Sequence, residues 1–379
     1  MSDILIWGDT IRHAELRHEI PLDVPDPFLY LEVGGGRHAV VSSLECARIA
    51  ALDGGVEVHP FEEYGHDELM NAGVDRSQAA LEVMSRACRS LGLAHGSVPA
   101  EFPIELADRL RGDGIELAVD RGLFEARRRI KSQAELAGIR RAQAAAEAGM
   151  RAAAELLRQA SPNGDGLLAG GEPLTCERLK AVIRQAVDRA GASPGETLIV
   201  SHGAQTASGH EAGSGPIQPG EPVVIDLWPR DPESACFADM TRTFVVGDAP
   251  AELRRYHELT RESLARALAA VRPGAAGREV HRISCAPYEE AGLPTQLTKQ
   301  PGQVLEEGFF HALGHGVGLE VHEAPALGRG PDQLVAGDVI TLEPGCYRPG
   351  FGGCRLEDLV LVTGDGAEVL TDFPYDLEP

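Results

Sequence analysis

The spacing of apolar residues predicts strands and helices in turn along the first part of the chain. Runs rich in valine, isoleucine and leucine predict strands at residues 38–44, 55–59 and 115–119, and the first of these continues into a helix at 45–52. Residues 77–91 carry apolar side chains at helical spacing instead. This order of elements is typical of an α/β domain.

A second domain is expected to begin with a long helix. Ser132 and Glu135 have the spacing of a capping box, and the alanine-rich sequence after them predicts a helix that runs to about residue 159. We therefore divide the chain into an N-terminal domain, residues 1–126, and a C-terminal domain, residues 127–379.

The rest of the C-terminal domain is expected to consist mainly of strands. The glycine- and proline-rich stretch 161–173 is interpreted as a loop, and residues 175–190 as a helix. From residue 197 onward the pattern favours strands, interrupted by one helix at about 251–271.

The composition is that of a globular protein and narrows the range of partners. The chain has 379 residues, 43% of them apolar and 25% charged, which suits two domains. A net charge of -23 repels phosphate, so we expect no nucleic-acid partner. We find neither an apolar run of membrane-spanning length nor a leader pattern, and therefore expect a cytoplasmic protein without a membrane partner. Seven scattered cysteines without a Cys-x-x-Cys pair argue against a disulfide framework or structural zinc.

Four carboxylates and one histidine stand in or beside apolar strands of the C-terminal domain. They are Asp226, Asp239, His315, Glu343 and Glu357. A single carboxylate of this kind is usually a charge at a strand end, but burying several is costly unless they are paired or bind metal. Two divalent cations about 3.5–4 Å apart would balance four carboxylates and activate a water between them. Such an oxygen-rich set suits manganese, cobalt, iron or catalytic zinc, and ligand type alone does not choose among these metals.

These residues belong to five short motifs. The motifs are Val-Ile-Asp-Leu ending at residue 227, Asp-Met-Thr-Arg-Thr-Phe at 239–244, Gly-His-Gly-Val-Gly-Leu-Glu-Val-His-Glu at 314–323, Thr-Leu-Glu-Pro-Gly at 341–345 and Arg-Leu-Glu-Asp at 355–358. In this order they resemble the motifs of the pita-bread metallopeptidases, which include prolidase, proline aminopeptidase and methionine aminopeptidase. The resemblance covers roughly residues 130–372. It implies a creatinase-like N-terminal α/β domain, matched only in size and pattern, followed by an α+β pita-bread catalytic domain.

The resemblance implies a role for each ligand. Asp226 would bind one metal through both of its oxygens, and Asp239 and Glu357 would bridge the two metals. His315 and Glu343 would complete the shell of the other metal. Mn²⁺ or Co²⁺ is expected first, with Zn²⁺ or Fe²⁺ as alternatives. A water shared by the two metals would be the nucleophile.

The resemblance also implies catalytic residues beside the ligands. Glu343 would accept the proton of the attacking water. His322, seven residues after the histidine ligand, matches the family histidine that contacts the substrate carbonyl, where it would stabilise an oxyanion. Arg355 shares a strand face with Glu357 and is expected either to orient a carboxylate or to meet a substrate carboxylate, with a plain salt bridge equally open.

A further family histidine lies upstream of the first aspartate. His210 stands sixteen residues before Asp226, close to the family spacing, whereas His202 is too far upstream, so we choose His210. His311 is expected to be a packed or hydrogen-bonded histidine rather than a ligand.

One interval departs from the family pattern. Asp226 and Asp239 are thirteen residues apart instead of the usual eleven, and the extra length falls in residues 229–233. This stretch is interpreted as a hairpin turn. Two added residues preserve the alternation of a strand, so both aspartates can still face the same side.

The leading interpretation is an Xaa-Pro dipeptidase or Xaa-Pro aminopeptidase that cleaves small proline-containing peptides with a metal-bridging hydroxide. The extra N-terminal domain favours this branch over methionine aminopeptidase, and the resemblance implies a homodimer. One alternative is a metal-dependent hydrolase of other C–N bonds, such as those of N-acyl compounds. Another is a relative that has lost catalysis and binds partners. The complete ligand set argues against this last alternative and against the metal-free mechanism of creatinase.

Overall fold

The computed structural model describes residues 3–164 and 166–379, and the chain divides into two compact units, Met1–Arg128 and Arg129–Pro379. The division predicted after residue 126 falls within helix α6 (Arg121–Arg129). In these described ranges no helix is both long enough and apolar enough to cross a membrane.

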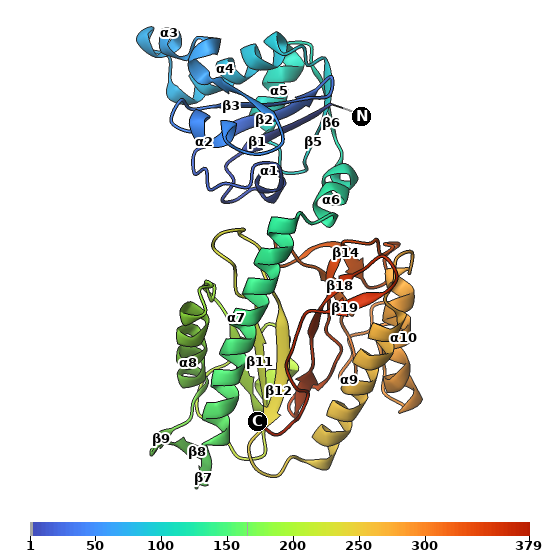
Figure 1. Ribbon diagram of the computed structural model, residues 1–379. Coiled ribbons are helices and arrows are strands. Elements are labelled where there is room, and N and C mark those ends of the chain that lie inside the picture. Colours follow the sequence, from blue (N-terminus) through green and yellow to red (C-terminus); the bar gives the residue numbers. More distant parts are fainter. Residues whose placement is uncertain (1–2, 165) are drawn as a thin grey trace. The chain divides into compact units, whose positions relative to one another are not determined.

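The N-terminal unit is built on a six-stranded sheet with the strand order β4-β3-β2-β1-β5-β6 (Figure 1). Its strands are β1 (Ile4–Gly8), β2 (Phe28–Val33), β3 (Gly36–Val41), β4 (Val56–Pro60), β5 (His95–Val98) and β6 (Glu116–Val119). The pairs β1–β2 and β2–β3 are antiparallel, whereas β3–β4, β1–β5 and β5–β6 are parallel. The strands predicted near residues 38–44, 55–59 and 115–119 correspond to β3, β4 and β6.

Apolar layers cover both faces of this sheet. Its helices are α1 (Ala14–Glu19), α2 (Cys46–Ala50), α3 (His66–Asn71), α4 (Arg76–Ser90), α5 (Ile104–Gly112) and α6, with a 3-10 turn η1 at Phe61–Tyr64. Leu5 and Leu31 pack in one cluster with residues of α4 and α5. Ile4 and Tyr30, their neighbours along the strands, pack in another cluster with residues of α1 and α2. The period of two along each strand therefore produces a layered α/β unit.

The C-terminal unit begins with two helices packed on a three-stranded sheet. Helix α7 (Gln133–Arg158) starts at the predicted capping box of Ser132 and Glu135, and α8 (Cys176–Arg189) starts at Thr175, whose side chain caps it. The sheet consists of β10 (Ile199–His202), β11 (Pro222–Leu227) and β12 (Met240–Val245), and the 3-10 turn η2 (Gly203–Ala207) follows β10. One apolar cluster joins both helices to these strands. The two helices predicted from sequence at the start of this unit are thus confirmed.

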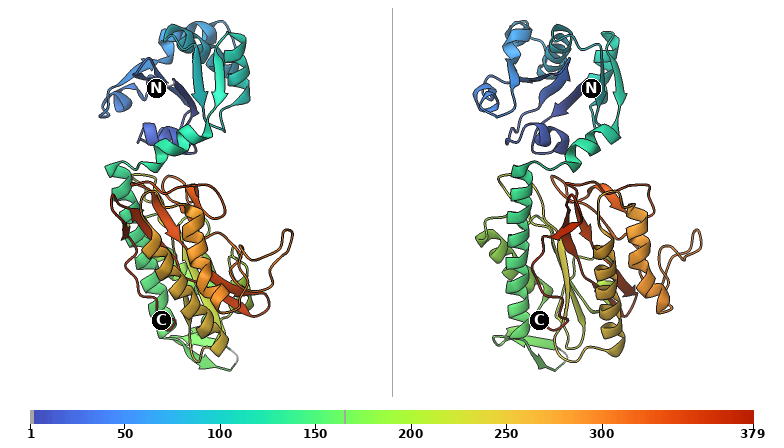
Figure 2. Two further views of the ribbon diagram at one scale, coloured as in Figure 1. Left: turned by 90° about the vertical axis from the view of Figure 1, so that its right-hand side faces the viewer. Right: turned by 45° about the vertical axis from the view of Figure 1, so that its right-hand side comes forward.

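A second sheet of the same unit has the strand order β14-β13-β15-β18-β19 and packs against two further helices, as Figure 2 shows. Its strands are β13 (Gly314–Gly316), β14 (Glu323–Leu327), β15 (Val339–Leu342), β18 (Asp358–Val362) and β19 (Ala367–Val369). The helices are α9 (Ala251–Ala270) and α10 (Gly277–Glu290), and a hairpin of β16 (Gly345–Arg348) and β17 (Gly352–Arg355) precedes β18. Leu264 of α9 and Val280 of α10 share a core with Ile340 and Val360 of the sheet.

Two sequence predictions in this unit were wrong. A single helix was expected after residue 250, but α10 follows α9; it contains Pro287 and several weak helix formers, which masked its pattern of buried residues. The stretch 161–173 was expected to be a loop, yet β7 (Ser161–Asn163), β8 (Gly166–Ala169) and β9 (Glu172–Pro173) form a small sheet. Strands of two to four residues carry too little periodicity to be recognised among glycine and proline.

Candidate active site

The five predicted metal ligands lie in or directly beside strands of the two sheets of the C-terminal unit. Asp226 lies in β11 and His315 in β13, whereas Asp239 precedes β12, Glu343 follows β15 and Glu357 precedes β18. All five line one cavity of about 790 Å³. The structure therefore brings together residues that are up to 131 positions apart in the chain.

The register of β11 and β12 places both aspartates on one side of their sheet. Asp226 pairs with Thr241 across the antiparallel ladder, so Asp239, two residues before Thr241, faces the same side as Asp226. The longer connection between them is anchored, because Arg141 makes two hydrogen bonds of 2.8 Å to the carboxylate of Asp231. The wider interval therefore leaves the facing of the aspartates unchanged, as predicted.

His315 stands between two glycines that lie in close contact with neighbouring backbone. A side chain at Gly314 would overlap the carbonyl oxygen of Thr341, and a side chain at Gly316 would overlap that of Ala324. The glycines on either side of the histidine are therefore required by the spacing of the strands. The histidine Nδ1 lies 3.1 Å from the carbonyl oxygen of Gly316, to which it donates, and this leaves Nε2 for the cavity.

The atoms of the site suit a divalent cation. Ligand atoms of Asp239, His315 and Glu357 all lie within 4.8 Å of one another, and Nε2 of His315 is 3.5 Å from Oε1 of Glu343. Among the described residues, Oδ1 of Asp226 and Oδ1 of Asp239 are buried and have no hydrogen-bond partner. A buried oxygen without a donor is costly, and a cation offsets that cost. Four carboxylates and one imidazole fit Mn²⁺, Co²⁺, Fe²⁺ or Zn²⁺.

The pKa shifts of the cavity residues also favour a bound divalent cation. Burial raises the pKa of Asp239 and of Glu357 well above the ordinary range, and the neighbouring carboxylates raise both further. Burial also raises the pKa of Glu343 to about 8, where Arg355 opposes the rise and Asp226 adds to it. These carboxylates repel one another without a counter-charge. Burial, together with the adjacent His322, lowers the pKa of His315 to about 4, so its imidazole is neutral, the form that binds metal.

Hydrogen bonds hold two of the carboxylates in place. The hydroxyl of Thr241 donates to Oε2 of Glu357 at 2.7 Å. Arg355 donates from Nη2 to Oδ2 of Asp226 at 2.5 Å and from Nε to the hydroxyl of Thr241 at 3.2 Å. Of the roles considered for Arg355, the structure thus shows it bonded to a carboxylate of the candidate site.

A buried arginine supports the backbone behind Glu357. Arg242 donates to the carbonyl oxygen of Glu357 at 2.7 Å and to Oδ1 of Asp358 at 2.9 Å. Its guanidinium also lies over the ring of Tyr375, 4.7 Å from the ring centroid. Sequence reasoning assigned no role to this arginine or to Thr241, although both stand in the motif that begins at Asp239.

The structure separates the two candidates for the upstream histidine. His210 lines the cavity, as does His322, whose ring centroid is 4.3 Å from that of His315. His202 instead pairs with Glu221, with Nδ1 2.7 Å from the carboxylate oxygen Oε2. His210 and His322 therefore remain the two histidines predicted to contact a substrate in the cavity.

Aromatic residues that sequence reasoning did not single out complete the cavity wall. Trp228, Phe310 and Tyr347 line it together with His311, whose ring nitrogens lie 2.8 Å from the carbonyl oxygen of Ala312 and 2.9 Å from the hydroxyl of Tyr347. A signal was present for Trp228, because it stands two residues after Asp226 and a strand repeats its facing every second residue.

Residues 137–364, more than half of the chain, match the model of metallopeptidase family M24. The chain belongs to metallopeptidase family M24. The resemblance to pita-bread metallopeptidases and the expectation of a peptidase-family hydrolase are thereby confirmed. A metallopeptidase family implies divalent metal ions, which agrees with the donor atoms of the cavity.

Proteins similar to this M24 member are known from several organisms. An Xaa-Pro dipeptidase of Pyrococcus furiosus is 36% identical over 190 residues, which are 48% of this chain and 49% of that relative, so the match spans about half the length of each. The prolidase of Pyrococcus horikoshii OT3 has a solved structure that is 25% identical, with a TM-score of 0.75 over 100% of this chain and 95% of its own. The dipeptidase PepE of Mycobacterium ulcerans is 27% identical, with a TM-score of 0.75 over 100% and 92% of the two chains. These structures confirm the predicted fold class, an N-terminal α/β domain followed by a pita-bread domain.

Proposed function

We propose that this M24 member is an Xaa-Pro peptidase that hydrolyses the bond before proline with two divalent cations. The convergence of Asp226, Asp239, His315, Glu343 and Glu357 on one cavity carries the proposal. Similarity to chains named Xaa-Pro dipeptidase and prolidase supports the choice of substrate. In this proposal Asp239 and Glu357 would be the ligands shared by the two cations, and burial together with neighbouring carboxylates raises the pKa of both well above the ordinary range.

The cavity holds groups suited to proton transfer and to charge stabilisation. When bound, two cations acidify a water and polarise a substrate carbonyl. Glu343, whose Oε1 lies 3.5 Å from Nε2 of His315, would accept the proton of the water as a carboxylate and return it to the leaving amine. His322 and His210 offer N–H donors to the carbonyl oxygen as negative charge develops there.

The cavity wall suits a proline ring. Trp228 and Phe310 present aromatic surface beside the candidate ligands. The nitrogen of an Xaa-Pro bond carries no hydrogen, so this side of the substrate needs no acceptor and can lie against apolar side chains. A substrate with a hydrogen on that nitrogen would leave a donor facing the wall, which is unfavourable.

The identity of the metal and the oligomeric state are part of the same proposal. We infer Mn²⁺ or Co²⁺ from the oxygen-rich donor set and a homodimer from the family resemblance. Metal analysis of protein purified from unsupplemented medium checks the first inference. Light scattering coupled to size-exclusion chromatography checks the second, and a monomeric mass would contradict it.

The deciding experiment compares an Xaa-Pro dipeptide with the matched Xaa-Pro tripeptide, before and after chelation and again after manganese or cobalt is restored. Cleavage of the dipeptide alone would identify a dipeptidase, and cleavage of the tripeptide an aminopeptidase. A matched peptide with alanine in place of proline serves as the control for the proline requirement. Metal-loaded protein that cleaves neither proline peptide contradicts the proposal and favours hydrolysis of another amide, such as an N-acyl amino acid.

A further inference from the structure

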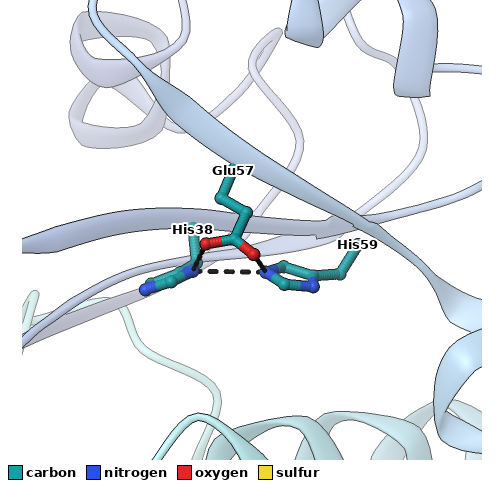
Figure 3. A group of neighbouring side chains, drawn as sticks. All are labelled: His38, Glu57 and His59. Atoms are coloured by element: carbon teal, nitrogen blue, oxygen red, sulfur yellow. Dashed lines mark hydrogen bonds and ion pairs between the residues drawn. The ribbon is translucent and has the colours of Figure 1, made fainter.

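Three potential metal ligands converge at one edge of the N-terminal sheet, far along the chain from the residues of the cavity. Figure 3 shows His38 of β3 together with Glu57 and His59 of β4, the edge strand. The parallel register pairs His38 with Glu57, and His59 stands two residues further along β4. All three side chains therefore project from the same face of the sheet.

The distances between their ligand atoms match the edges of a small coordination polyhedron. Nδ1 of His38 lies 3.2 Å from Nε2 of His59, and the carboxylate oxygens of Glu57 lie 3.5 Å from the first nitrogen and 3.8 Å from the second. Zinc bonds of about 2.0–2.1 Å at tetrahedral angles place ligand atoms about 3.3–3.4 Å apart. A hydrogen bond between the two rings explains the shortest distance, but it does not explain why one carboxylate approaches both nitrogens.

A second carboxylate orients the more buried ring. Nδ1 of His59 lies 3.3 Å from Oε2 of Glu63, and Nε2 faces the cluster. Histidines that bind metal through one nitrogen commonly donate from the other nitrogen to a carboxylate. Glu63 thus supports the tautomer in which Nε2 of His59 carries a lone pair.

The charges around the cluster also suit a divalent cation. Imidazole is a common ligand of zinc, and the carboxylates of Glu57 and Glu63 are groups of the kind that bind a divalent cation or support its histidine ligands. The side chain of Glu57 is 68% exposed, whereas those of His38 and His59 are 14% and 11% exposed, which gives a cation a route from solvent to largely buried nitrogens.

We propose that His38, Glu57 and His59 form a mononuclear binding site for a zinc-class divalent cation, with the fourth position open to water. Two of its three ligands are imidazoles, so it favours zinc more strongly than the carboxylate-rich cavity of the C-terminal unit does. Since the ligands come from β3 and β4, the bound cation ties the edge strand of the sheet to its neighbour. This site is separate from the proposed peptidase function and does not depend on it.

The test is zinc binding by the full-length chain, measured as metal per chain after equilibrium dialysis against one fixed concentration of free Zn²⁺. The wild type is compared with His38→Ala and with His95→Ala, which removes an exposed histidine of β5 in the same unit. All three proteins keep the cavity of the C-terminal unit. The wild type and His95→Ala are expected to hold one more zinc ion per chain than His38→Ala.

Equal zinc content in the wild type and His38→Ala, with folding of both checked by circular dichroism, overturns the proposal. If His38→Ala does not fold, Glu57→Gln replaces it, because the side chain of Glu57 is 68% exposed and its loss opens no cavity in a core. The same deficit of one zinc ion is then expected, and its absence overturns the proposal. X-ray absorption at the zinc edge gives an independent readout, since the extra ion must show scattering from two imidazole rings that the variant lacks.

Discussion

The hydroxyl of Thr241 lies 2.7 Å from Oε2 of Glu357 and donates a hydrogen bond to it in the buried region between the two sheets of the C-terminal unit. Arg355 donates to the same hydroxyl oxygen at 3.2 Å, which leaves the hydroxyl hydrogen for the carboxylate. The threonine therefore fixes the orientation of the Glu357 carboxylate, and each carboxylate oxygen keeps a lone pair for a cation.

Replacing this threonine should weaken metal binding rather than folding alone. Thr241→Val keeps the shape of the side chain but removes the bond to Glu357, so we expect metal affinity to fall about 10–100-fold. Activity should fall at limiting manganese and recover at high manganese. Thr243→Val is the matched control, because the hydroxyl of Thr243 bonds the backbone of Arg355 at 2.8 and 3.0 Å. A loss of metal affinity of the same size in both variants would contradict the assignment.

The two proposed bridging ligands should be indispensable. In the proposed site, Asp239→Ala and Glu357→Ala would each remove a ligand shared by both cations, so the loss should exceed that of an outer-shell change and leave less than about 1% of wild-type kcat/KM. Asp365→Ala, which changes an exposed aspartate of the β18–β19 turn, should leave kcat/KM unchanged. Turnover near the wild-type value in either bridging variant would refute the two-metal assignment.

The ion pair behind the site should be important for stability. The side chains of Arg242 and Asp358 are each 1% exposed and lie 2.9 Å apart. Arg242→Met leaves the carboxylate of Asp358 buried without its partner, and we expect the free energy of unfolding to fall by about 3–5 kcal/mol. Urea denaturation measures this change.

Two further variants test whether the loss of stability in Arg242→Met comes from the buried ion pair. Arg140→Met removes one partner of the exposed pair with Glu368 and should cost less than about 1 kcal/mol. The double variant Arg242→Met, Asp358→Asn should recover part of the loss, because it removes the buried charge. A loss in Arg242→Met no larger than in Arg140→Met would show that the buried pair is not stabilising.

A buried histidine should make the fold sensitive to acid. Burial lowers the pKa of His281 to about 4, although a hydrogen bond with Gln296 opposes the shift. Because the folded state holds the ring neutral, its contribution is fully present above pH 6.5 and is lost as the pH falls through 4, which amounts to about 3 kcal/mol.

The variant His281→Gln cannot titrate and isolates this contribution. The free energy of unfolding should decline less steeply from pH 6.5 to pH 4 in His281→Gln than in the wild type. His95→Gln, which changes an exposed ring, should keep the wild-type slope. Identical slopes in the wild type and His281→Gln would show that His281 does not titrate below its usual range.

The proposed ligands could be predicted from the sequence because each stands in a short local motif. Orienting a carboxylate was one of the roles predicted for Arg355, but its partner Asp226 and the role of Thr241 could not be predicted, since the bonds Thr241–Glu357 and Arg355–Asp226 join residues 116 and 129 positions apart. Those pairings follow from how the sheets pack, and no local pattern encodes them. The cluster at His38 was missed for the same reason: its only sequence signal is Glu57-x-His59, which has the period of a strand face.

The helices likewise include some that could be predicted from the sequence and one that could not. Helices α7 and α8 could be predicted because an N-cap residue and a long apolar stripe agree there. Helix α10 has buried positions at helical spacing, but these include His281, Ser284 and Cys285, which do not stand out as apolar. The burial of such polar residues is decided by tertiary packing rather than by propensity.

Gly314 and Gly316, on either side of His315, restrict which residues around the cavity can be substituted. Substitution at Gly314 or Gly316 forces strands apart, so the strand that carries His315 tolerates almost no variation. Ser208 and Phe310 line the same cavity from connections outside the strands, where a new side chain leaves the strand spacing intact. Altered specificity can therefore evolve through these connections while the reaction chemistry stays constant, and a mutagenesis library intended to redirect substrate choice should begin with Ser208 and Phe310.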